Sequence, residues 1–265
     1  MRFFAANLYI ELQTKTVLKK ERHAFIMHQL NLHNKVLSND LCQIMEVSED
    51  TIRRDLQELS AAEKLIKVHG GALSLSFSEV QFSSDHLYSP EKKRIIAEKA
   101  VSLVENGMFV LTGGGTTIVE MAKVLPPQLR ATFMTGSIPA VNEYLKHPSI
   151  DVVMIGDKIL KDSKITCGSE AISKIRQLNA DICFLGINAI DSKSGVTEND
   201  WEVANLKREM IEASKKVVCL SISEKLNSSQ PLRICGLDKI THLITELPPD
   251  DKRLSDYHKA GVIVL

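Results

Sequence analysis

Two adjacent arginines, Arg53 and Arg54, stand in a segment whose side chains suit contact with a nucleic acid. Arginine and glutamine can pair bidentately with purine edges in the major groove, and arginine, serine and threonine also hold phosphate. Thr51 precedes the arginines and Gln57 follows them, so all four side chains can share the exposed face of one helix. Their early position is typical of a recognition helix, which enters the groove by its first turns.

A second group of candidate DNA contacts follows in the segment from Leu65 to Ala72. This segment predicts a β-ribbon wing in which Lys67 and His69 can reach phosphate and the two glycines allow a close approach. The predicted DNA-binding residues are Ser38, Ser48, Thr51, Arg53, Arg54, Gln57, Lys67, His69 and Gly70.

Two short helices are expected to position these side chains as a helix-turn-helix. Ser38 can cap the first helix and Ser48 the second, whose first turn carries acidic residues where the helix dipole favours negative charge. Val47 is expected to fill the turn between them. Apolar spacing predicts one buried stripe at Leu41, Ile44 and Met45 and another at Ile52, Leu56 and Leu59.

Two other interpretations of this segment stay open on residue types alone. Small three-helix domains also serve as protein-docking modules, and residues 1–78 carry 10 Lys+Arg against 9 Asp+Glu, which is no broad basic surface. Arg53 and Arg54 could also be a solvated pair that bridges to Asp50 and Glu58 at helical spacing.

A glycine-rich turn, Gly113-Gly114-Gly115-Thr116-Thr117, lies between a predicted strand and a predicted helix. Glycines there let backbone N–H groups converge on an anion, and the start of the following helix adds partial positive charge. The turn is neither a Walker A motif nor a Gly-x-Gly-x-x-Gly dinucleotide motif. The alternative is a tight turn that binds no ligand.

Two further groups belong to the same predicted anion site. Thr135-Gly136-Ser137 is a similar strand-to-helix turn, and Lys225 follows another predicted strand, although a single lysine is more often a surface residue. Loops at the carboxyl ends of parallel strands are where such sheets bind ligands, so these groups can converge. The predicted effector-binding residues are Gly113, Gly114, Gly115, Thr116, Thr117, Thr135, Ser137 and Lys225.

The whole chain has the composition of an ordinary soluble globular protein, with 265 residues, 44% of them hydrophobic and 25% charged. Its 33 Lys+Arg balance 33 Asp+Glu, so bulk charge neither indicates nor excludes a polyanionic partner. No apolar run approaches the roughly 18 residues that span a bilayer. Five widely spaced cysteines argue against a disulfide framework or zinc site and for a reducing cytoplasm. We therefore expect a cytoplasmic protein without metal or cofactor.

Four parts are expected along the chain: an N-terminal tail (1–18), a small winged helix-turn-helix domain (19–72), a serine-rich linker (73–90) and a larger α/β domain (91–265). In the last part, short apolar runs alternate with helical stretches, which predicts a largely parallel sheet covered on both faces. The predicted strands are 108–111, 132–135, 152–155, 182–185, 217–221, 242–245 and 262–265. The predicted helices are 90–105, 116–125, 137–146, 168–178, 201–214 and 252–259.

The string Val-Ser-Glu-Asp-Thr-Ile-Arg-Arg-Asp-Leu at residues 47–56, with Glu-Arg-His at 21–23 and His-Gly-Gly-Ala at 69–72, closely resembles the DNA-binding domain of DeoR-family transcriptional regulators. The resemblance extends across about residues 19–265. It implies a C-terminal effector-sensing domain similar to pentose-phosphate isomerases, which in this family typically senses a phosphorylated sugar. The implied function is a regulator, most often a repressor, that binds double-stranded operator DNA as a homo-oligomer and whose affinity the effector changes.

This chain departs from the family pattern at several positions. Lys67 stands where Arg is usual, and Glu46 stands in the turn where Gly is frequent; a left-handed Glu there costs about 1 kcal/mol. In the larger domain Gly113, Gly136 and Ile222 replace an Asp, an Asn and an Asp. The phosphate contacts can therefore persist while the sugar-binding side chains have changed, or the effector is not an ordinary sugar phosphate.

An enzyme is the alternative function, namely a sugar-phosphate isomerase that carries an accessory winged helix. Aldose–ketose isomerisation needs a positioned base, usually a carboxylate. Gly113 and Ile222 remove two acids, which leaves Glu198, Asp200 and Glu224 as candidates. Because a fold does not decide function, no catalytic residue is predicted.

Overall fold

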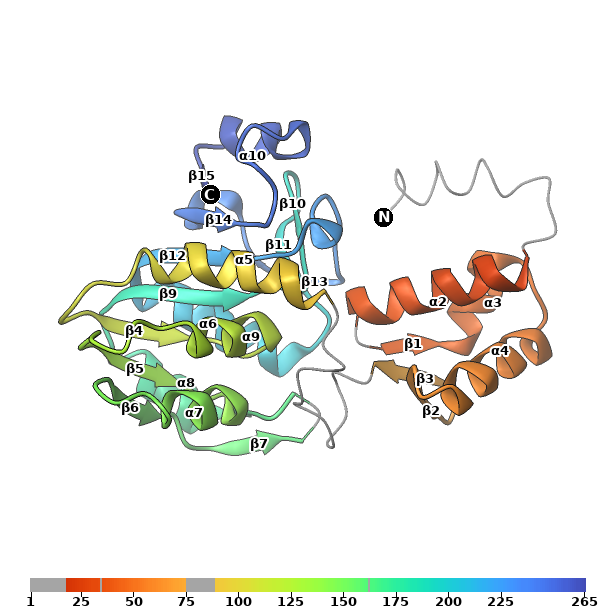
Figure 1. Cartoon of the computed structure of the whole chain (residues 1–265), viewed down its shortest axis with the longest axis horizontal. Coiled ribbons are helices and arrows are strands. Elements are labelled where there is room, and N and C mark those ends of the chain that lie inside the picture. The colour runs from red at the N-terminus through yellow and green to blue at the C-terminus, as the bar shows by residue number, and fades with distance from the viewer. Residues whose placement is uncertain (1–17, 34, 75–88, 162) are drawn as a thin grey trace. The chain divides into compact units, whose positions relative to one another are not determined.

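The computed structural model describes residues 18–33, 35–74, 89–161 and 163–265, and the chain divides into two compact units, residues 1–88 and 89–265. Figure 1 labels their elements. The predicted tail, apart from Leu18, lies outside the described residues.

The described part of the first unit consists of three helices and a small antiparallel sheet (Figure 1). In chain order its elements are α2 (Lys19–His33), β1 (Lys35–Leu37), α3 (Ser38–Met45), α4 (Glu49–Ala61), β2 (Leu65–Val68) and β3 (Gly71–Ser74). The strands are ordered β1-β3-β2, so β2 and β3 form the predicted wing hairpin and β1 adds a third strand that the sequence did not predict.

Apolar residues from all three helices and the sheet fill the core of this unit. Ile52, Leu56 and Leu59 are buried as predicted, and Val47 packs against the same cluster. Ile44 was wrongly assigned to the inner stripe, because its side chain is 37% exposed while Leu41 and Met45 are buried. The predicted cap at Ser38 is also wrong: α3 has Leu37 at its N-cap position with no side-chain hydrogen bond.

A seven-stranded parallel sheet organises the second unit. Its order is β15-β14-β12-β9-β4-β5-β6, and its strands are β4 (Phe109–Thr112), β5 (Thr132–Thr135), β6 (Asp151–Met154), β9 (Ala180–Gly186), β12 (Ser214–Leu220), β14 (His242–Ile244) and β15 (Ile263–Val264). All six neighbouring pairs are parallel. All seven predicted strands are therefore confirmed, with ends shifted by up to three residues.

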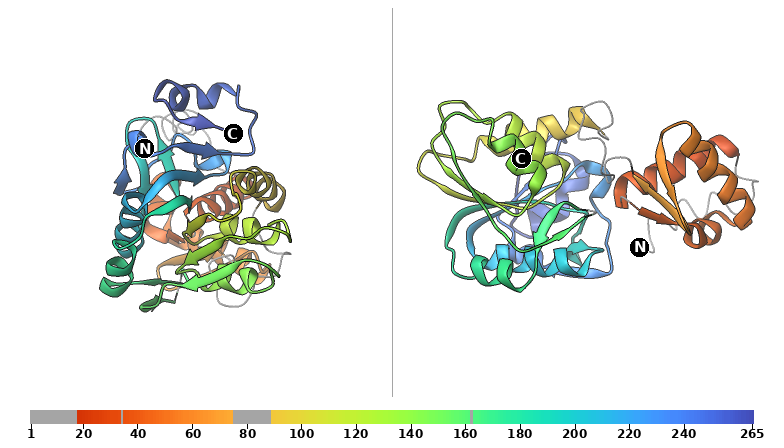
Figure 2. Two further views of the ribbon diagram at one scale, coloured as in Figure 1. Left: turned by 90° about the vertical axis from the view of Figure 1, so that its left-hand side faces the viewer. Right: turned by 90° about the horizontal axis from the view of Figure 1, so that it is seen from below.

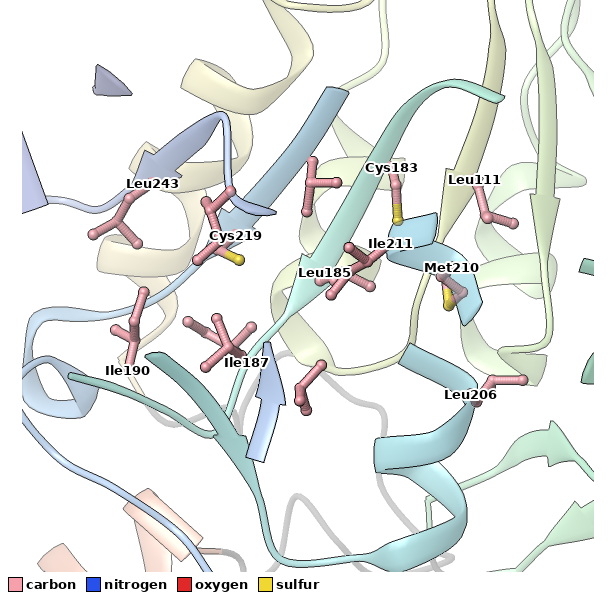
Figure 3. Close-up of a cluster of buried hydrophobic side chains, with 14 of the residues drawn as sticks. Leu111, Cys183, Leu185, Ile187, Ile190, Leu206, Met210, Ile211, Cys219 and Leu243 are labelled. Atoms are coloured by element: carbon pink, nitrogen blue, oxygen red, sulfur yellow. The ribbon is translucent and has the colours of Figure 1, made fainter. Parts of the chain in front are cut away.

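Helices cover both faces of this sheet, with α5, α6 and α7 on one face and α8 and α9 on the other (Figure 2). The helices are α5 (Pro90–Val101), α6 (Thr116–Lys123), α7 (Ile138–Tyr144), α8 (Ser169–Ile175), α9 (Trp201–Glu212) and α10 (Ser255–Lys259), with short 3-10 helices η3 (Ser223–Lys225), η4 (Leu237–Lys239) and η5 (Lys252–Leu254). On the α9 face, Cys183 and Leu185 of β9 lie with Leu206 and Met210 in one apolar cluster (Figure 3). Burial on both faces explains why the strands lack polar alternation.

In the described part of the second unit, five short strands outside the main sheet escaped prediction. β7 (Lys158–Leu160) and β8 (Ile165–Cys167) form an antiparallel hairpin. β10 (Ala189–Asp191), β11 (Gly195–Glu198) and β13 (Leu232–Cys235) form a second small sheet. Ile190, Val196 and Ile234 of this second sheet join the apolar cluster on the α9 face.

The predicted linker and several helix ends need correction. Leu73 and Ser74 belong to β3, and Pro90 is the first residue of α5, so the 73–90 segment is shorter than predicted at both ends. Residues 75–88 of that segment lie outside the described residues. The first helix of this unit ends at Val101 rather than residue 105, and the stretch 252–259 begins as 3-10 helix before α10.

Candidate functional site

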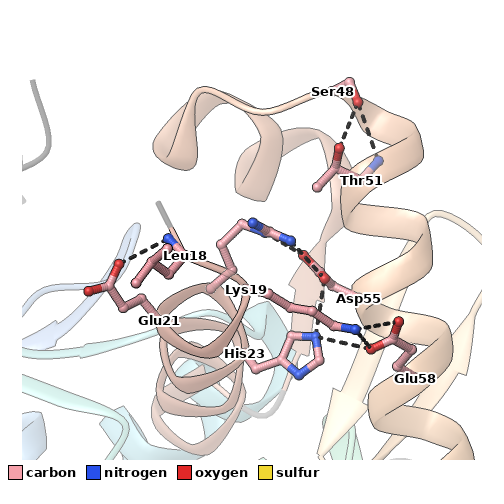
Figure 4. A network of polar contacts seen from close by, with 9 residues as sticks. Leu18, Lys19, Glu21, His23, Ser48, Thr51, Asp55 and Glu58 are labelled. Carbon is pink, nitrogen blue, oxygen red and sulfur yellow. Dashed lines mark hydrogen bonds and ion pairs between the residues drawn. The ribbon is translucent and has the colours of Figure 1, made fainter. Parts of the chain in front are cut away.

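The recognition-helix candidate α4 begins where the sequence predicted. Ser48 has extended backbone, and its hydroxyl accepts from the Thr51 backbone N–H at 3.3 Å and lies 2.9 Å from the Thr51 hydroxyl (Figure 4). Glu49 and Asp50 occupy the first turn, where the helix dipole favours carboxylates. The cap thereby places Arg53 and Arg54 within the first two turns of α4.

A buried carboxylate fixes α4 against α2. Asp55 is 2% exposed and accepts from Arg22 Nε at 2.6 Å and Nη2 at 3.1 Å, while His23 Nε2 lies 3.1 Å from the same carboxylate (Figure 4). The hydrogen bond to Asp55 raises the pKa of Arg22. The sequence analysis assigned no role to Asp55, although its position three residues after Ile52 placed it on the buried stripe.

The opposite face of α4 presents its polar side chains outward. Arg53, Arg54 and Gln57 are exposed. Arg53 Nη2 lies 3.0 Å from Asp50 Oδ1 with both side chains 69% exposed, which confirms one of the two predicted bridges. Arg54 has no hydrogen bond or ion pair to any residue in the described ranges, and Glu58 instead pairs with Lys19 at 2.5 Å. The exposed Arg53–Asp50 pair adds little stability, so Arg53 can exchange Asp50 for another partner.

The wing follows α4 directly and contacts it. Lys67 of β2 donates to Gln57 Oε1 at 2.8 Å, and His69 is exposed in the turn. Gly70 has φ +76°, and Gly71 leaves no room for a side chain because a Cβ there would collide with the Val36 carbonyl of β1. Gly71 therefore serves the packing of β1, while the close approach of the wing glycines to DNA stays a prediction.

Ser38 differs from the other DNA-binding candidates because its side chain is 9% exposed. Its backbone N–H donates to the Gly70 carbonyl at 2.8 Å, which ties the start of α3 to the turn of the wing. The structure thus gives Ser38 a structural contact in place of the predicted cap.

The glycine turn of the second unit joins β4 to α6 and meets two neighbouring segments. Gly113 N–H donates to the Phe184 carbonyl of β9 at 2.9 Å. A Cβ on Gly114 would lie 2.7 Å from Ile165 Cγ2, and one on Gly186 would lie 2.8 Å from the Gly114 carbonyl oxygen. Gly115, with φ +107°, holds the N-cap position of α6 and offers no side-chain cap. Larger residues would therefore separate β4, β8 and β9 at this edge.

The hydroxyls of Thr135 and Ser137 hold the adjacent turn together. Thr135 Oγ1 donates to the Thr112 carbonyl at 2.9 Å and accepts from the Ser137 N–H at 3.1 Å. Ser137 Oγ accepts from the Ala140 N–H at 3.4 Å and caps α7. A Cβ on Gly136 would lie 2.5 Å from Thr166 Oγ1, so only glycine fits beside β8. Both hydroxyls are buried and already hydrogen-bonded, which favours a structural role.

Two lysines lie on the elements around the same edge of the sheet. Lys225 of η3 donates to the Ile187 carbonyl, just after β9, at 3.2 Å. Lys93 of α5 is 7% exposed, and burial together with the charge of Lys225 lowers the pKa of Lys93 to about 7. Burial and the charge of Lys207 lower the pKa of Lys225 to about 8. Lys93 therefore carries a charge that burial and the neighbouring Lys225 both oppose, and an anion bound beside it would favour its protonated form.

Lys93 is not among the predicted effector-binding residues. A detectable signal was present, because Lys93 precedes Ile96, Ala97 and Ala100 at helical spacing and so lies on the buried face of α5. Burial of a lysine is rare enough that its position on an apolar stripe marks it as a candidate functional residue.

Each of the three carboxylates considered for isomerase chemistry has a partner in the structure. Glu198 is 1% exposed and its Oε2 accepts from Lys207 at 2.7 Å. Asp200 caps α9 by accepting from the Val203 N–H at 3.0 Å. Glu224 accepts from Lys92 at 2.5 Å. These contacts give each carboxylate a structural role.

Within the described ranges, no group of three or more His, Cys, Asp or Glu residues is arranged to hold a metal ion. Over the same ranges, no helix combines the length and apolar character needed to cross a membrane.

Two family models match this chain. Residues 22–77 match the DeoR-like helix-turn-helix domain, and residues 89–247 match the DeoR C terminal sensor domain. Among solved structures, ribose 5-phosphate isomerase A from Methanocaldococcus jannaschii is similar over 52% of this chain and 55% of its own length, with a TM-score of 0.39 and 17% identity.

Curated relatives match over most of their length. The HTH-type transcriptional regulator YulB of Bacillus subtilis is 31% identical over 91% of this chain and 95% of its own. The HTH-type transcriptional repressor GlcR of the same organism is 30% identical over 93% of this chain and 96% of its own length. The glycerol-3-phosphate regulon repressor of Haemophilus influenzae is 28% identical over 86% of this chain and 90% of its own length. Together with the two family matches, these relatives show that the chain belongs to the DeoR family of DNA-binding transcriptional regulators.

Proposed function

We propose that this chain is a cytoplasmic transcriptional repressor whose α4 and β2–β3 wing bind operator DNA, and whose second unit binds a phosphorylated sugar or related metabolite that controls this binding. The observation that carries the DNA-binding part is the exposed Arg53–Arg54 pair on a helix held by Asp55. Arg54 has its donors available, and Arg53 gives up only a solvated ion pair when it contacts a base or phosphate.

A footprint of the full-length chain on DNA tests this face. The operator is first selected from random duplex DNA, and Arg54→Ala is expected to weaken the specific complex by about 1–3 kcal/mol. Arg53→Ala combined with Arg54→Ala should abolish the footprint. Arg130→Ala, at an exposed arginine of the second unit, is the control. An unchanged footprint in the double variant would show that this face does not bind DNA.

The effector part rests on the glycine turn, which contacts the end of β9 through Gly113, and on Lys225, which donates to the Ile187 carbonyl just after β9, with Lys93 close enough for the two charges to interact. A phosphate dianion favours the protonated form of both lysines, and backbone N–H groups at the start of α6 are suited to the same anion. Gly136 fits only as glycine beside β8, so the sugar hydroxyls have to be read by residues other than the usual Asn. The name of the glycerol-3-phosphate regulon repressor is consistent with a phosphorylated effector.

A thermal-shift screen of phosphorylated sugars tests the effector site. A ligand that raises the melting temperature of the full-length chain should lose this effect in Thr116→Val with Thr117→Val, and in Lys225→Met. Lys216→Met, at an exposed lysine of β12, is the matched control and should keep the shift. An undiminished shift in both site variants would place the ligand elsewhere.

We further propose that the repressor acts as a homo-oligomer, because DNA-binding domains of this class usually recognise paired half-sites. Light scattering of the free chain and of its operator complex gives the subunit number directly. The isomerase alternative predicts turnover of a pentose or hexose phosphate. We expect none across a panel of both classes, because Glu198, Asp200 and Glu224 are each already engaged.

A further inference from the structure

The contact between Lys67 and Gln57 joins the wing to the recognition helix on the face assigned to DNA. Lys67 is the third residue of β2, and Gln57 lies in the second half of α4. Lys67 Nζ lies 2.8 Å from Gln57 Oε1, although the two residues are ten positions apart in the sequence. Gln57 is exposed and Lys67 is half-buried.

This contact fixes which atom of the amide faces outward. An ammonium group has three donors and no acceptor, so only the carbonyl oxygen of the glutamine can face it. The Nε2 group must then lie on the far side of the amide. A glutamine without such a neighbour can rotate its amide and offer either a donor or an acceptor to a base.

The major-groove edges of the four bases respond differently to a fixed donor. Guanine offers N7 and O6, adenine offers N7 and thymine offers O4 as acceptors, whereas cytosine offers only its N4 amino donor. A glutamine held with its NH₂ group outward therefore has a hydrogen-bond partner on three bases and faces a second donor on cytosine.

We propose that Lys67 is a specificity-determining residue: through its hydrogen bond to Gln57 Oε1 it holds the Gln57 amide with Nε2 outward, so that the repressor discriminates against cytosine at the base that Gln57 contacts. Lys67 acts as a positioning residue, since Gln57 makes the base contact. The inference rests on the proposed function, in which the exposed face of α4 enters the major groove.

A phosphate contact by Lys67 makes a different prediction. Loss of a phosphate contact weakens binding to all sequences about equally and lowers the salt dependence by roughly one charge. Loss of a positioning contact changes the ratio of affinities among bases at one position. The ratio therefore separates the two roles, even if the total affinity also changes.

The test uses the full-length chain and the operator selected from random DNA. The position read by Gln57 is the one whose base preference disappears in Gln57→Ala. Dissociation constants are then measured for the four base pairs at that position with wild type, Lys67→Met, Gln57→Ala and the double variant. Wild type should bind the cytosine duplex roughly fivefold to tenfold more weakly than the best duplex, as expected for one hydrogen bond to a base edge.

Lys67→Met should reduce this discrimination to less than about twofold, and the double variant should lose no more than either single variant, because coupled residues are not additive. Lys67→Arg should retain it, since a guanidinium group also only donates. Lys67→Glu should turn the amide over and raise the relative affinity for the cytosine duplex.

Melting temperatures close to wild type confirm that each variant is folded, and if Lys67→Met does not fold, Lys67→Glu and Lys67→Arg carry the test. Unchanged discrimination in Lys67→Met, or a uniform loss on all four duplexes, overturns the proposal. If Gln57→Ala alters no base preference on a selected operator, the inference fails while DNA binding stands. If no operator is selected at all, the proposed function fails with it.

Discussion

Glu46 holds the turn between α3 and α4 in a left-handed conformation, with φ 53° and ψ 40°. Its N–H still donates to the Cys42 carbonyl, so the turn is a closed helix end. A residue with a Cβ costs about 1–2 kcal/mol in this conformation, and glycine does not. This conformation was expected from the resemblance to the DeoR family, in which glycine is frequent at this position.

Replacing Glu46 with glycine is therefore expected to stabilise the first unit. Glu46→Gly should raise the free energy of unfolding by about 1 kcal/mol or slightly less, because glycine also gives the unfolded chain more freedom. Gln43→Gly, in the interior of α3, should instead lower it by about 1 kcal/mol. Chemical denaturation of both variants measures the difference, and equal destabilisation would contradict the strain at Glu46.

Contacts between distant segments explain which residue roles the sequence could not reveal. The need for glycine at positions 71 and 136 comes from Val36 and Thr166, which lie 35 and 30 residues away in the chain. The pKa of Lys93 is lowered by burial and, after it, by the charge of Lys225, which lies 132 residues later in the chain. Local patterns identified Ser48 and the Arg53–Arg54 face, because a helix cap and a helix face depend only on neighbouring residues.

At the scale of elements, runs of apolar residues decided what could be predicted. Each strand of the main sheet contains or overlaps such a run, so the sequence showed all seven of them, including β6, which is largely exposed. β7 was missed because Lys158 and Ile159 are exposed and the strand has three residues. β11 pairs with β13, more than 30 residues later, so no local turn pattern marks that pair.

The α2–α4 contact leads to a prediction about this element pair. Asp55→Ala leaves Arg22 without its carboxylate in a side-chain environment that is 13% exposed, and breaking such a pair costs about 3 kcal/mol. Calorimetry of the full-length chain should show a lower melting temperature for the first unit, with weaker operator binding near that temperature. Glu58→Ala is the control, since its exposed pair with Lys19 contributes about 1 kcal/mol or less. Equal effects of the two substitutions would show that Asp55 does not fix α4.

At the scale of the whole molecule, the depressed pKa values of Lys93 and Lys225 connect ligand binding and stability to pH. Both values, about 7 and about 8, lie below the 10.5 of an ordinary lysine. Between these lowered pKa values and 10.5, the lysines of the unfolded chain bind more protons than those of the folded chain. The free energy of unfolding of the ligand-free protein therefore rises with pH over this interval. A bound phosphate favours the protonated lysines, so effector affinity falls over the same interval.

These opposite trends should appear between about pH 7 and about pH 9, where the phosphate is already close to dianionic. Melting temperature without effector should rise with pH, while effector affinity, measured at constant ionic strength, should fall. Lys93→Met should flatten both trends, and Lys216→Met should not. Effector affinity that is constant across this range would mean that neither lysine changes its protonation on binding.

Reciprocity between the two binding sites gives the last prediction. If a saturating effector weakens operator binding by some factor, the operator must weaken effector binding by the same factor, because both describe one coupling free energy. That factor is expected to be about 5–150-fold.

Trp201, the only tryptophan of the chain and 62% exposed at the start of α9, offers a fluorescence signal for effector titration with and without operator. In Thr116→Val with Thr117→Val, the operator should bind equally well with and without effector. The contradicting result is an effector affinity that is the same in the free and the DNA-bound wild-type protein, while operator affinity still depends on the effector. Coupling at equilibrium within one molecule does not permit this combination, so the effector would then act on DNA binding through another species in solution.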